Sequence, residues 1–217
     1  GGKTVVVGNP GREEMWHADR AAARRAVGAK DGQVVIVSFG GSLGAQRLNE
    51  AVAALAQWEL RERSFLHIHA TGSIEKKDFA AMAARMGIDG DERFFIREYI
   101  DDMPVVMAAA DLVVCRAGAS TISELTAIAK PAVLVPSPNV VADHQTKNAR
   151  VLSDRGAALL VSEQECDGKT DALFNTISDL LCHPEKRENM EKALREMAIP
   201  DASEHIYRTL VELMDRK

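Results

Sequence analysis

The sequence predicts an α/β fold, a doubly wound parallel sheet that ends in packed helices. Short apolar strands alternate with segments of helical spacing over the first three quarters of the chain. Most of these strands are apolar throughout rather than alternating with polar residues, which is typical of a parallel sheet covered on both faces. Strands are no longer predicted after Asp171, where three helical stretches follow. We therefore expect one domain over residues 1–217, with ligands bound beyond the carboxyl ends of its strands.

Each predicted strand is a short run rich in β-branched and aliphatic residues, bounded by turn-forming residues. In chain order they are Lys3–Val7, Val34–Ser38, Phe65–His69, Phe94–Tyr99, Leu112–Cys115, Ala132–Val135 and Ala158–Val161.

Helical spacing of apolar residues is clearest at Leu48–Ala56 and Phe79–Arg85. In the final third, Pro184 and Pro200 are expected in the first turns of helices, where a missing N–H costs nothing. We also expect helix capping by Asp101 and Asp143, with Asp102 adding first-turn charge. The mixed charges of residues 184–192 are typical of a solvated helix surface.

Composition excludes several classes of function. The formal net charge of -5 and pI near 5.7 disfavour nucleic acid as a partner, because binding to a duplex usually depends on a net-basic face. Three cysteines without C-x-x-C spacing indicate neither a disulfide framework nor a zinc site, which fits the cytoplasm. No apolar run approaches the roughly 20 residues that cross a bilayer, and no signal-peptide pattern opens the chain.

A glycine-rich turn, Gly40-Gly-Ser-Leu-Gly-Ala45, follows the second predicted strand and precedes a helix. Gly40, Gly41 and Gly44 would let the backbone approach a ligand closely, and Ser42 could bond a phosphate. Glycine is also common in such turns for packing alone. The turn lacks the Gly-Lys-Ser/Thr ending of an ATP-binding P-loop and the spacing of a dinucleotide fingerprint. ATP hydrolysis and NAD binding are therefore disfavoured.

A second turn joins the strand Leu112–Cys115 to a helix that begins in the run Arg116–Glu124. The unpaired N–H groups and dipole of a helix start favour a phosphate, and Arg116 adds a cation. Glu124 can reach the hydroxyl pair of a sugar, while Gln145 at the next helix can both donate and accept. Together these groups indicate a nucleotide-sugar pocket. The alternative for Glu124 is a capping box that starts at Thr121.

Metal binding is not predicted. His67 and His69 lie on one face of a strand, but the spacing suggests no third ligand, so core or strand-end roles are favoured. The pair Asp101-Asp102 resembles the metal-binding acidic pair of some sugar transferases, yet helix capping and first-turn charge explain both residues.

Several motifs together resemble the carboxyl-terminal half of the MurG family of peptidoglycan N-acetylglucosaminyltransferases, which are two-domain enzymes of the GT-B fold. The motifs occur in the family's order over essentially the whole chain, and the last two are specific when found together. They are residues 8–12, 40–45, 99–103, 115–124 and 143–149. The resemblance implies a Rossmann-like donor domain. Gly11 departs from the pattern, because the family usually has a bulkier residue before Arg12.

The resemblance implies a binding site for the donor UDP-N-acetylglucosamine. Its diphosphate would meet Arg12, Ser42 and Arg116, its uracil edge would be read by the backbone of Ile100, and Glu124 would hold its ribose. The residues expected at this site are Arg12, Ser42, Ile100, Arg116, Ala119, Ser120, Thr121, Ile122, Ser123, Glu124, His144 and Gln145, with Gly40, Gly41, Ser42 and Gly44 as a phosphate loop.

For the whole enzyme, the resemblance implies an inverting transfer of N-acetylglucosamine to undecaprenyl-diphosphate-linked N-acetylmuramyl-pentapeptide at the cytoplasmic face of the membrane. No cofactor or metal is expected, because helix ends and arginines can stabilise the departing diphosphate. The catalytic base, the acceptor site and the membrane contact belong to an amino-terminal half that this sequence does not include. The chain alone is expected to bind donor without transferring it.

Two alternatives stay open. The chain could be a naturally free-standing donor subunit that joins a separate acceptor protein. It could also be a UDP-sugar-binding protein that is not a transferase, such as a nucleotide-binding module or an enzyme of the epimerase type. Such a protein would bind UDP without preferring the N-acetylglucosaminyl group, whose identity no motif fixes.

Overall fold

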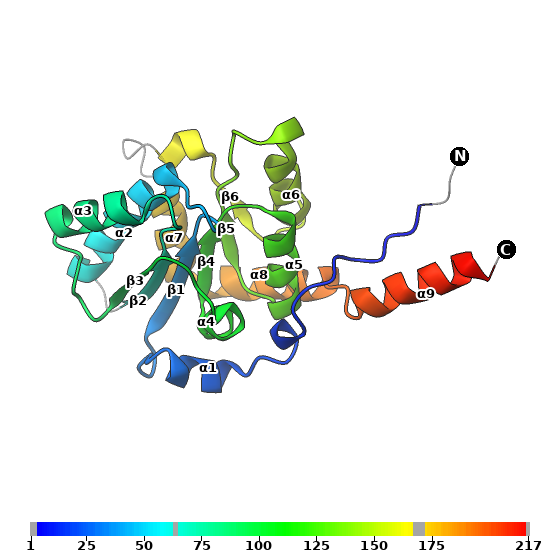
Figure 1. Ribbon diagram of the computed structural model, residues 1–217. Coiled ribbons are helices and arrows are strands. Elements are labelled where there is room, and N and C mark those ends of the chain that lie inside the picture. Colours follow the sequence, from blue (N-terminus) through cyan, green and yellow to red (C-terminus); the bar gives the residue numbers. More distant parts are fainter. Residues whose placement is uncertain (1–3, 63–64, 167–171, 216–217) are drawn as a thin grey trace.

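The computed structural model describes residues 4–62, 65–166 and 172–215, and its centre is a six-stranded sheet with helices on both faces (Figure 1). The strands lie in the order β3-β2-β1-β4-β5-β6, and every neighbouring pair is parallel. The predicted fold class is confirmed. The strands are β1 (Val34–Phe39), β2 (Phe65–Ala70), β3 (Phe94–Arg97), β4 (Leu112–Cys115), β5 (Ala132–Leu134) and β6 (Leu159–Leu160).

Helices follow most strands, as expected for right-handed crossovers between parallel strands. The α-helices are α1 (Arg20–Ala26), α2 (Gln46–Glu62), α3 (Lys76–Met86), α4 (Met103–Ala109), α5 (Ala119–Ile128), α6 (His144–Ser153), α7 (Ala172–Cys182), α8 (Pro184–Met197) and α9 (Ala202–Met214). Short 3-10 turns are η1 (Glu13–Met15), η2 (Val141–Asp143) and η3 (Glu163–Cys166). The last three α-helices confirm the predicted helical ending, although Asp171 lies outside the described residues.

The sheet separates two apolar cores. Along β1, Val35 and Val37 enter the core shared with α1, α4, α5 and α6, whereas Ile36 enters the core shared with α2, α3 and α7. This alternation follows from the two-residue period of a strand. Helix α8 contributes to both cores, with Leu194 on the first side and Met190 on the second.

The predicted first strand is wrong for the residues that the structure describes. Residues 4–7 form no strand, and Lys3 lies outside the described part of the chain. The segment leaves the sheet and runs toward the side where α9 projects, so no strand edge accepts its hydrogen bonds (Figure 1). Val5 and Val6 are accordingly exposed. Apolar β-branched composition made the segment resemble a strand, but a strand also needs a neighbour.

The predicted helix starts need three corrections. Asp102, not Asp101, occupies the N-cap position of α4, and its carboxylate accepts a hydrogen bond from Arg97 rather than capping. Asp143 occupies the N-cap position of α6, but its side chain makes no capping bond and its φ is 51°. Pro184 begins α8 as predicted, whereas Pro200 precedes α9, because left-handed Asp201 intervenes.

Candidate functional site

The strand order places a topological switch between β1 and β4. From β1 the chain proceeds outward through β2 and β3, then returns to form β4 on the other side of β1. Phe39 at the end of β1 is paired with Cys115 at the end of β4. The two turns singled out in the sequence therefore leave the sheet side by side, at the same edge. In doubly wound folds, ligands bind in the crevice at such a switch.

The glycine-rich turn after β1 is tightly packed against the turn after β2. A Cβ on Gly44 would lie 2.3 Å from the carbonyl oxygen of Thr71, and the φ of Gly44 is 96°. The Ser42 carbonyl accepts a hydrogen bond from the Ser73 N–H at 3.0 Å, and the Leu43 carbonyl accepts one from Ile74 at 3.2 Å. Both glycine conformation and close approach are required here.

The backbone carbonyls of residues 41–43 accept hydrogen bonds from other backbone groups, whereas some N–H groups of this turn have no such partner among the described residues. Within residues 4–62, 65–166 and 172–215, neither the Ser42 N–H nor the Leu43 N–H has a hydrogen-bond partner. The Ser42 hydroxyl also lies on this exposed turn. Unpaired N–H groups at a sheet edge are what an anionic ligand needs.

Helix α5 presents a second set of N–H groups beside the first. Gly118 is its N-cap residue and offers no side chain, and the first backbone bond of the helix runs from Ile122 to the Gly118 carbonyl. The N–H groups of Ala119, Ser120 and Thr121 are thus without partners in the described structure. From α6, Asn148 donates to the Ala117 carbonyl at 3.0 Å and holds this turn in place. An uncapped helix start favours a negatively charged ligand.

Glu124 lies inside α5, more than a turn beyond its start, and Arg12 approaches it. The Arg12 Nε atom is 3.8 Å from Glu124 Oε1. Burial raises the pKa of the Glu124 carboxyl, and the Arg12 guanidinium partly offsets that rise. Burial, with Glu124 as a second cause, raises the pKa of the Cys115 thiol. The capping-box alternative is wrong, because Gly118 rather than Thr121 is the N-cap residue.

Arg116 points to a different partner from the one expected. Its guanidinium donates to Glu163 Oε1 at 2.8 Å and to the Val135 carbonyl at 3.1 Å. Both side chains of this ion pair are largely buried. The pair joins the end of β4 to η3, which follows β6 in the chain. Glu163 gave no sequence signal, because it lies 47 residues further along the chain.

The loop before α6 has an unusual backbone. Ala142 and Asp143 both adopt left-handed conformations, which cost free energy in residues other than glycine. Gln145 Oε1 accepts a hydrogen bond from the Ser137 N–H at 2.9 Å, and the His144 ring lies 3.0 Å from the Val141 carbonyl. The amide nitrogen of Gln145 has no partner among the described residues, so it can still donate to a ligand.

Ile100 is buried and follows β3 in the same sheet edge, near the start of α4. Within the part of the chain that the structure describes, its backbone N–H and C=O have no hydrogen-bond partner. Unpaired main-chain groups of this kind can read the edge of a base.

His67 and His69 have the core roles favoured in the sequence. Both are buried in β2, and each ring lies within hydrogen-bond distance of the Ser38 hydroxyl. No group of three or more His, Cys, Asp or Glu side chains among the described residues is arranged to hold a metal ion. None of the described helices has both the length and the apolar character needed to span a bilayer.

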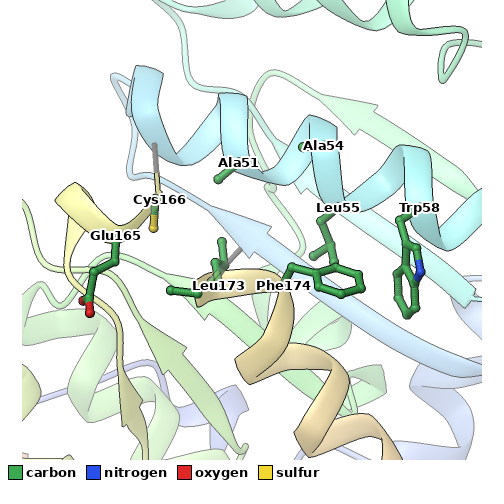
Figure 2. Close-up of a pocket in the computed structure, with 9 residues that line it drawn as sticks. Ala51, Ala54, Leu55, Trp58, Glu165, Cys166, Leu173 and Phe174 are labelled. Atoms are coloured by element: carbon green, nitrogen blue, oxygen red, sulfur yellow. The ribbon is translucent and has the colours of Figure 1, made fainter. Parts of the chain in front are cut away.

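The structure also contains an apolar cavity that the sequence did not reveal. It has a volume of about 290 Å³ and lies between α2, η3 and α7. Trp58 and Phe174 meet edge to face there, with ring centroids 4.6 Å apart, and Glu165 and Cys166 lie at the other end (Figure 2). The cavity does not include the turns after β1 and β4, and none of the described residues that line it is a lysine or an arginine.

Known proteins resemble the chain in both sequence and structure. Residues 35–206 match the family described as the glycosyltransferase family 28 C-terminal domain. A relative from Salinibacter ruber (strain DSM 13855 / M31) is 44% identical over 213 residues, 98% of this chain and 55% of the relative. It is named UDP-N-acetylglucosamine–N-acetylmuramyl-(pentapeptide) pyrophosphoryl-undecaprenol N-acetylglucosamine transferase.

Solved structures of glycosyltransferases also resemble the chain. The crystal structure of Acinetobacter baumannii MurG matches with a TM-score of 0.72 and 29% identity, covering 96% of this chain and 58% of that one. UDP-GlcNAc 2-epimerase from Neisseria meningitidis shares the fold alone, with a TM-score of 0.61, 15% identity and coverage of 88% and 48%. The chain spans a little over half the length of its similar relatives. It belongs to glycosyltransferase family 28, whose C-terminal domain it carries.

Proposed function

We propose that this chain is the donor-binding half of an inverting glycosyltransferase and binds UDP-N-acetylglucosamine in the crevice between β1 and β4. The single observation that carries the proposal is the pairing of Phe39 with Cys115, which brings two turns with unpaired N–H groups to one point. Family membership and the names of the relatives support the choice of donor.

In this proposal the diphosphate is bound mainly by backbone. The N–H groups of Ser42 and Leu43 and those at the start of α5 surround it, and the helix dipole adds favourable potential. Arg12 supplies the nearby cation. Arg116 would reach the diphosphate only after leaving Glu163, so we assign it the role of holding the turn after β4.

The remaining contacts recognise the nucleoside and the sugar. The Glu124 carboxylate accepts hydrogen bonds from the ribose hydroxyls, and the free backbone groups of Ile100 pair with the uracil edge. The Gln145 amide donates to a hydroxyl of the N-acetylglucosamine, with His144 beside it. The residues that wrap the nucleotide are those of the first turns of α5, Ala119, Ser120, Thr121, Ile122 and Ser123.

The whole enzyme would transfer the sugar by a direct displacement. The C4 hydroxyl of a lipid-linked N-acetylmuramyl-pentapeptide attacks the anomeric carbon, the bond from that carbon to UDP breaks, and the hydroxyl proton passes to a base. UDP leaves from the opposite face. The chain described here would stabilise the negative charge that grows on the leaving diphosphate. We assign the base, the acceptor site and the membrane contact to the other half, at the cytoplasmic face of the membrane.

Helix α9 supports the existence of such a second half. Tyr207, Leu210, Leu213 and Met214 are exposed on a helix of 13 residues that projects from the sheet domain (Figure 1). A helix of this length is marginal in water unless its apolar side packs against a partner. We propose that the acceptor half covers this side, whether it belongs to the same polypeptide or to a separate subunit.

Calorimetry tests the proposed function. The chain should bind UDP, and it should prefer UDP-N-acetylglucosamine to UDP-glucose. Glu124→Ala should weaken UDP binding by about tenfold or more, the value of a hydrogen bond to a charged group. It should weaken binding of 2′-deoxy-UDP much less, because one of the lost bonds is already missing.

A matched control is Glu191→Ala, which also removes a carboxylate paired with an arginine but lies on α8. It should leave UDP binding unchanged. Binding of UDP without any preference among sugars would favour a UDP-sugar-binding protein that is not this transferase. Failure to bind UDP at all would exclude the donor-domain proposal.

A further inference from the structure

A continuous row of buried polar side chains crosses the core beneath the turn after β1. The Ser38 Oγ atom lies 2.7 Å from Nε2 of His67 and 2.8 Å from Nδ1 of His69. Nδ1 of His67 lies 2.8 Å from Oε2 of Glu59. The row thus joins β1, β2 and α2 through four side chains, each almost completely inaccessible to solvent.

The hydroxyl of Ser38 is the centre of this row. It carries a single hydrogen, so it can donate to at most one of the two ring nitrogens and must accept from the other. No other described side chain offers these two ring nitrogens a hydrogen bond. Loss of the hydroxyl would leave Nε2 of His67 without a partner and would remove the side-chain contact of Nδ1 of His69. Ser38 therefore couples the two histidines to each other and, through His67, to α2.

A contribution to the stability of the fold does not explain why polar side chains occupy these buried positions. The surrounding core is apolar, with Phe79 and Phe94 against the ring of His69. Nε2 of His69 and Oε1 of Glu59 are buried without partners in the described structure. Apolar residues of the same shape can replace a buried hydrogen-bonded pair at little cost or even with a gain in stability. Departures from an apolar core of this kind are expected at functional or strained sites.

The row lies next to the glycine-rich turn in the chain. Ser38 is two residues before Gly40, and Glu59 lies on the helix that the turn enters. Asn49, also buried on α2, donates to the Thr71 carbonyl at 3.0 Å, on the turn that packs against Gly44. Both stems of the turn are thus fixed by buried polar contacts to β2 and its following residues.

We propose that Ser38 is a positioning residue, whose hydroxyl links β1, β2 and α2 and so holds the turn at residues 40–45 in the shape that receives the diphosphate. The inference rests on the proposed function for the identity of the ligand. The positioning itself can be measured without a ligand. Ser38 does not touch the donor in this account.

The test compares Ser38→Ala with the unaltered chain in three measurements. Hydrogen exchange of the Gly44 and Ser73 amides reports the turn without ligand, calorimetry reports UDP affinity, and thermal unfolding reports stability. We expect exchange at these amides to quicken and UDP affinity to fall by about fivefold, the effect of one ordering hydrogen bond. The melting temperature should fall by about as much as in the control variant Gln33→Met, because each substitution removes two hydrogen bonds of a buried side chain.

His69→Phe is a second variant that keeps the ring contacts with Phe79 and Phe94 and removes an unpartnered nitrogen. It should fold at least as stably as the unaltered chain and should still loosen the turn. If Ser38→Ala does not fold, His69→Phe therefore tests the positioning role by itself. The control is Gln33→Met at the opposite end of the same strand pair. This substitution removes two hydrogen bonds, one donated to the Phe65 carbonyl and one accepted from the Lys30 N–H. It should leave the turn and UDP affinity unchanged.

The outcomes are distinct. Unchanged exchange at Gly44 and Ser73 in both variants would overturn the positioning role, whatever happens to UDP affinity. Equal loosening in Gln33→Met would also overturn it, because the effect would then be general destabilisation. If the unaltered chain binds no UDP, the proposed function fails, while the exchange measurement still decides whether Ser38 positions the turn.

Discussion

Large apolar side chains are mostly buried in the sheet domain, whereas on helix α9 they are mostly exposed. In the sheet domain, two cores bury the aliphatic residues of β2, β4 and β5 and all those of β1 except Val34. On α9, Leu210 and Met214 are 55% and 72% exposed. Both regions have helical or strand periodicity of the usual kind, so the difference lies in the neighbours that are present. The contrast fits our proposal, in which the sheet domain forms the donor site and a further part covers the apolar side of α9.

The largest effect is expected in the sheet domain, at Gly44. Gly44→Ala places a Cβ against the Thr71 carbonyl in a left-handed backbone, so the turns after β1 and β2 must separate. We expect a loss of more than about 3 kcal/mol in unfolding free energy, or complete loss of UDP binding. Urea unfolding measures the unfolding free energy, and calorimetry measures UDP binding.

Gly90→Ala is the matched control for Gly44→Ala. Gly90 also has a positive φ, 75°, but nothing lies within 4 Å of the position of its Cβ. It should cost only about 1 kcal/mol and leave UDP binding intact. Similar results for the two glycines would show that the close approach of the turns does not matter.

The next largest loss of stability is expected when a leucine of the core is shortened. Leu194 on α8 is fully buried against the sheet. Leu194→Ala should lower the unfolding free energy by about 3 kcal/mol, since it removes buried apolar contacts and leaves a cavity. Urea unfolding followed by circular dichroism is the measurement. A loss below about 1 kcal/mol would mean that α8 is not part of the core.

The buried histidine pair predicts a dependence of stability on pH. Burial, with His67 as a second cause, lowers the pKa of His69 to about 3. The unfolded chain takes up a proton near pH 6.5, while the folded chain does not, so falling pH favours unfolding. This contribution is fully present above pH 6.5 and is lost progressively between 6.5 and 3.

Between pH 7 and pH 5 the His69 contribution should amount to about 2 kcal/mol. Urea unfolding of the unaltered chain and of His69→Phe at both values isolates it, because carboxylates contribute equally to both proteins. Identical pH dependence in the two proteins would contradict a neutral, buried His69.

The smallest effect is expected on α9. Leu210→Ala removes the same atoms as Leu194→Ala, but from an exposed position. The unfolding free energy of this chain should change by less than about 0.5 kcal/mol. Addition of an acceptor half should raise the cost of the same substitution. A cost near that of Leu194→Ala in the chain alone would show that α9 already packs on the sheet domain.

Most of the fold was predictable from the sequence because strands and helices there have local signals. The runs Val34–Ser38 and Phe65–His69 are rich in residues that favour strands, so their composition alone predicts them. The segment at residues 4–7 carries the same propensity and forms no strand, because pairing depends on a neighbour that the sequence does not show. The Gly44 turn and the start of α5 were predicted from their glycines and small residues.

What could not be predicted depends on contacts between distant residues. Arg116 was expected at the ligand, but it pairs with Glu163, and that pairing requires the positions of β5 and β6. Similarly, nothing local marks Glu59 as the partner of His67. The adjacency of β1 and β4, which places the two turns together, follows from the strand order and not from either motif.

In the proposed function, the turn at residues 40–45 and the start of α5 bind one diphosphate together. The most direct measurement is titration of the ¹⁵N-labelled chain with UDP, followed by amide chemical shifts. We expect the largest shifts to occur together at Ser42, Leu43 and Ala119–Thr121, with one common affinity. Shifts confined to one of the two turns, or centred on the cavity of Trp58 and Phe174, would contradict it.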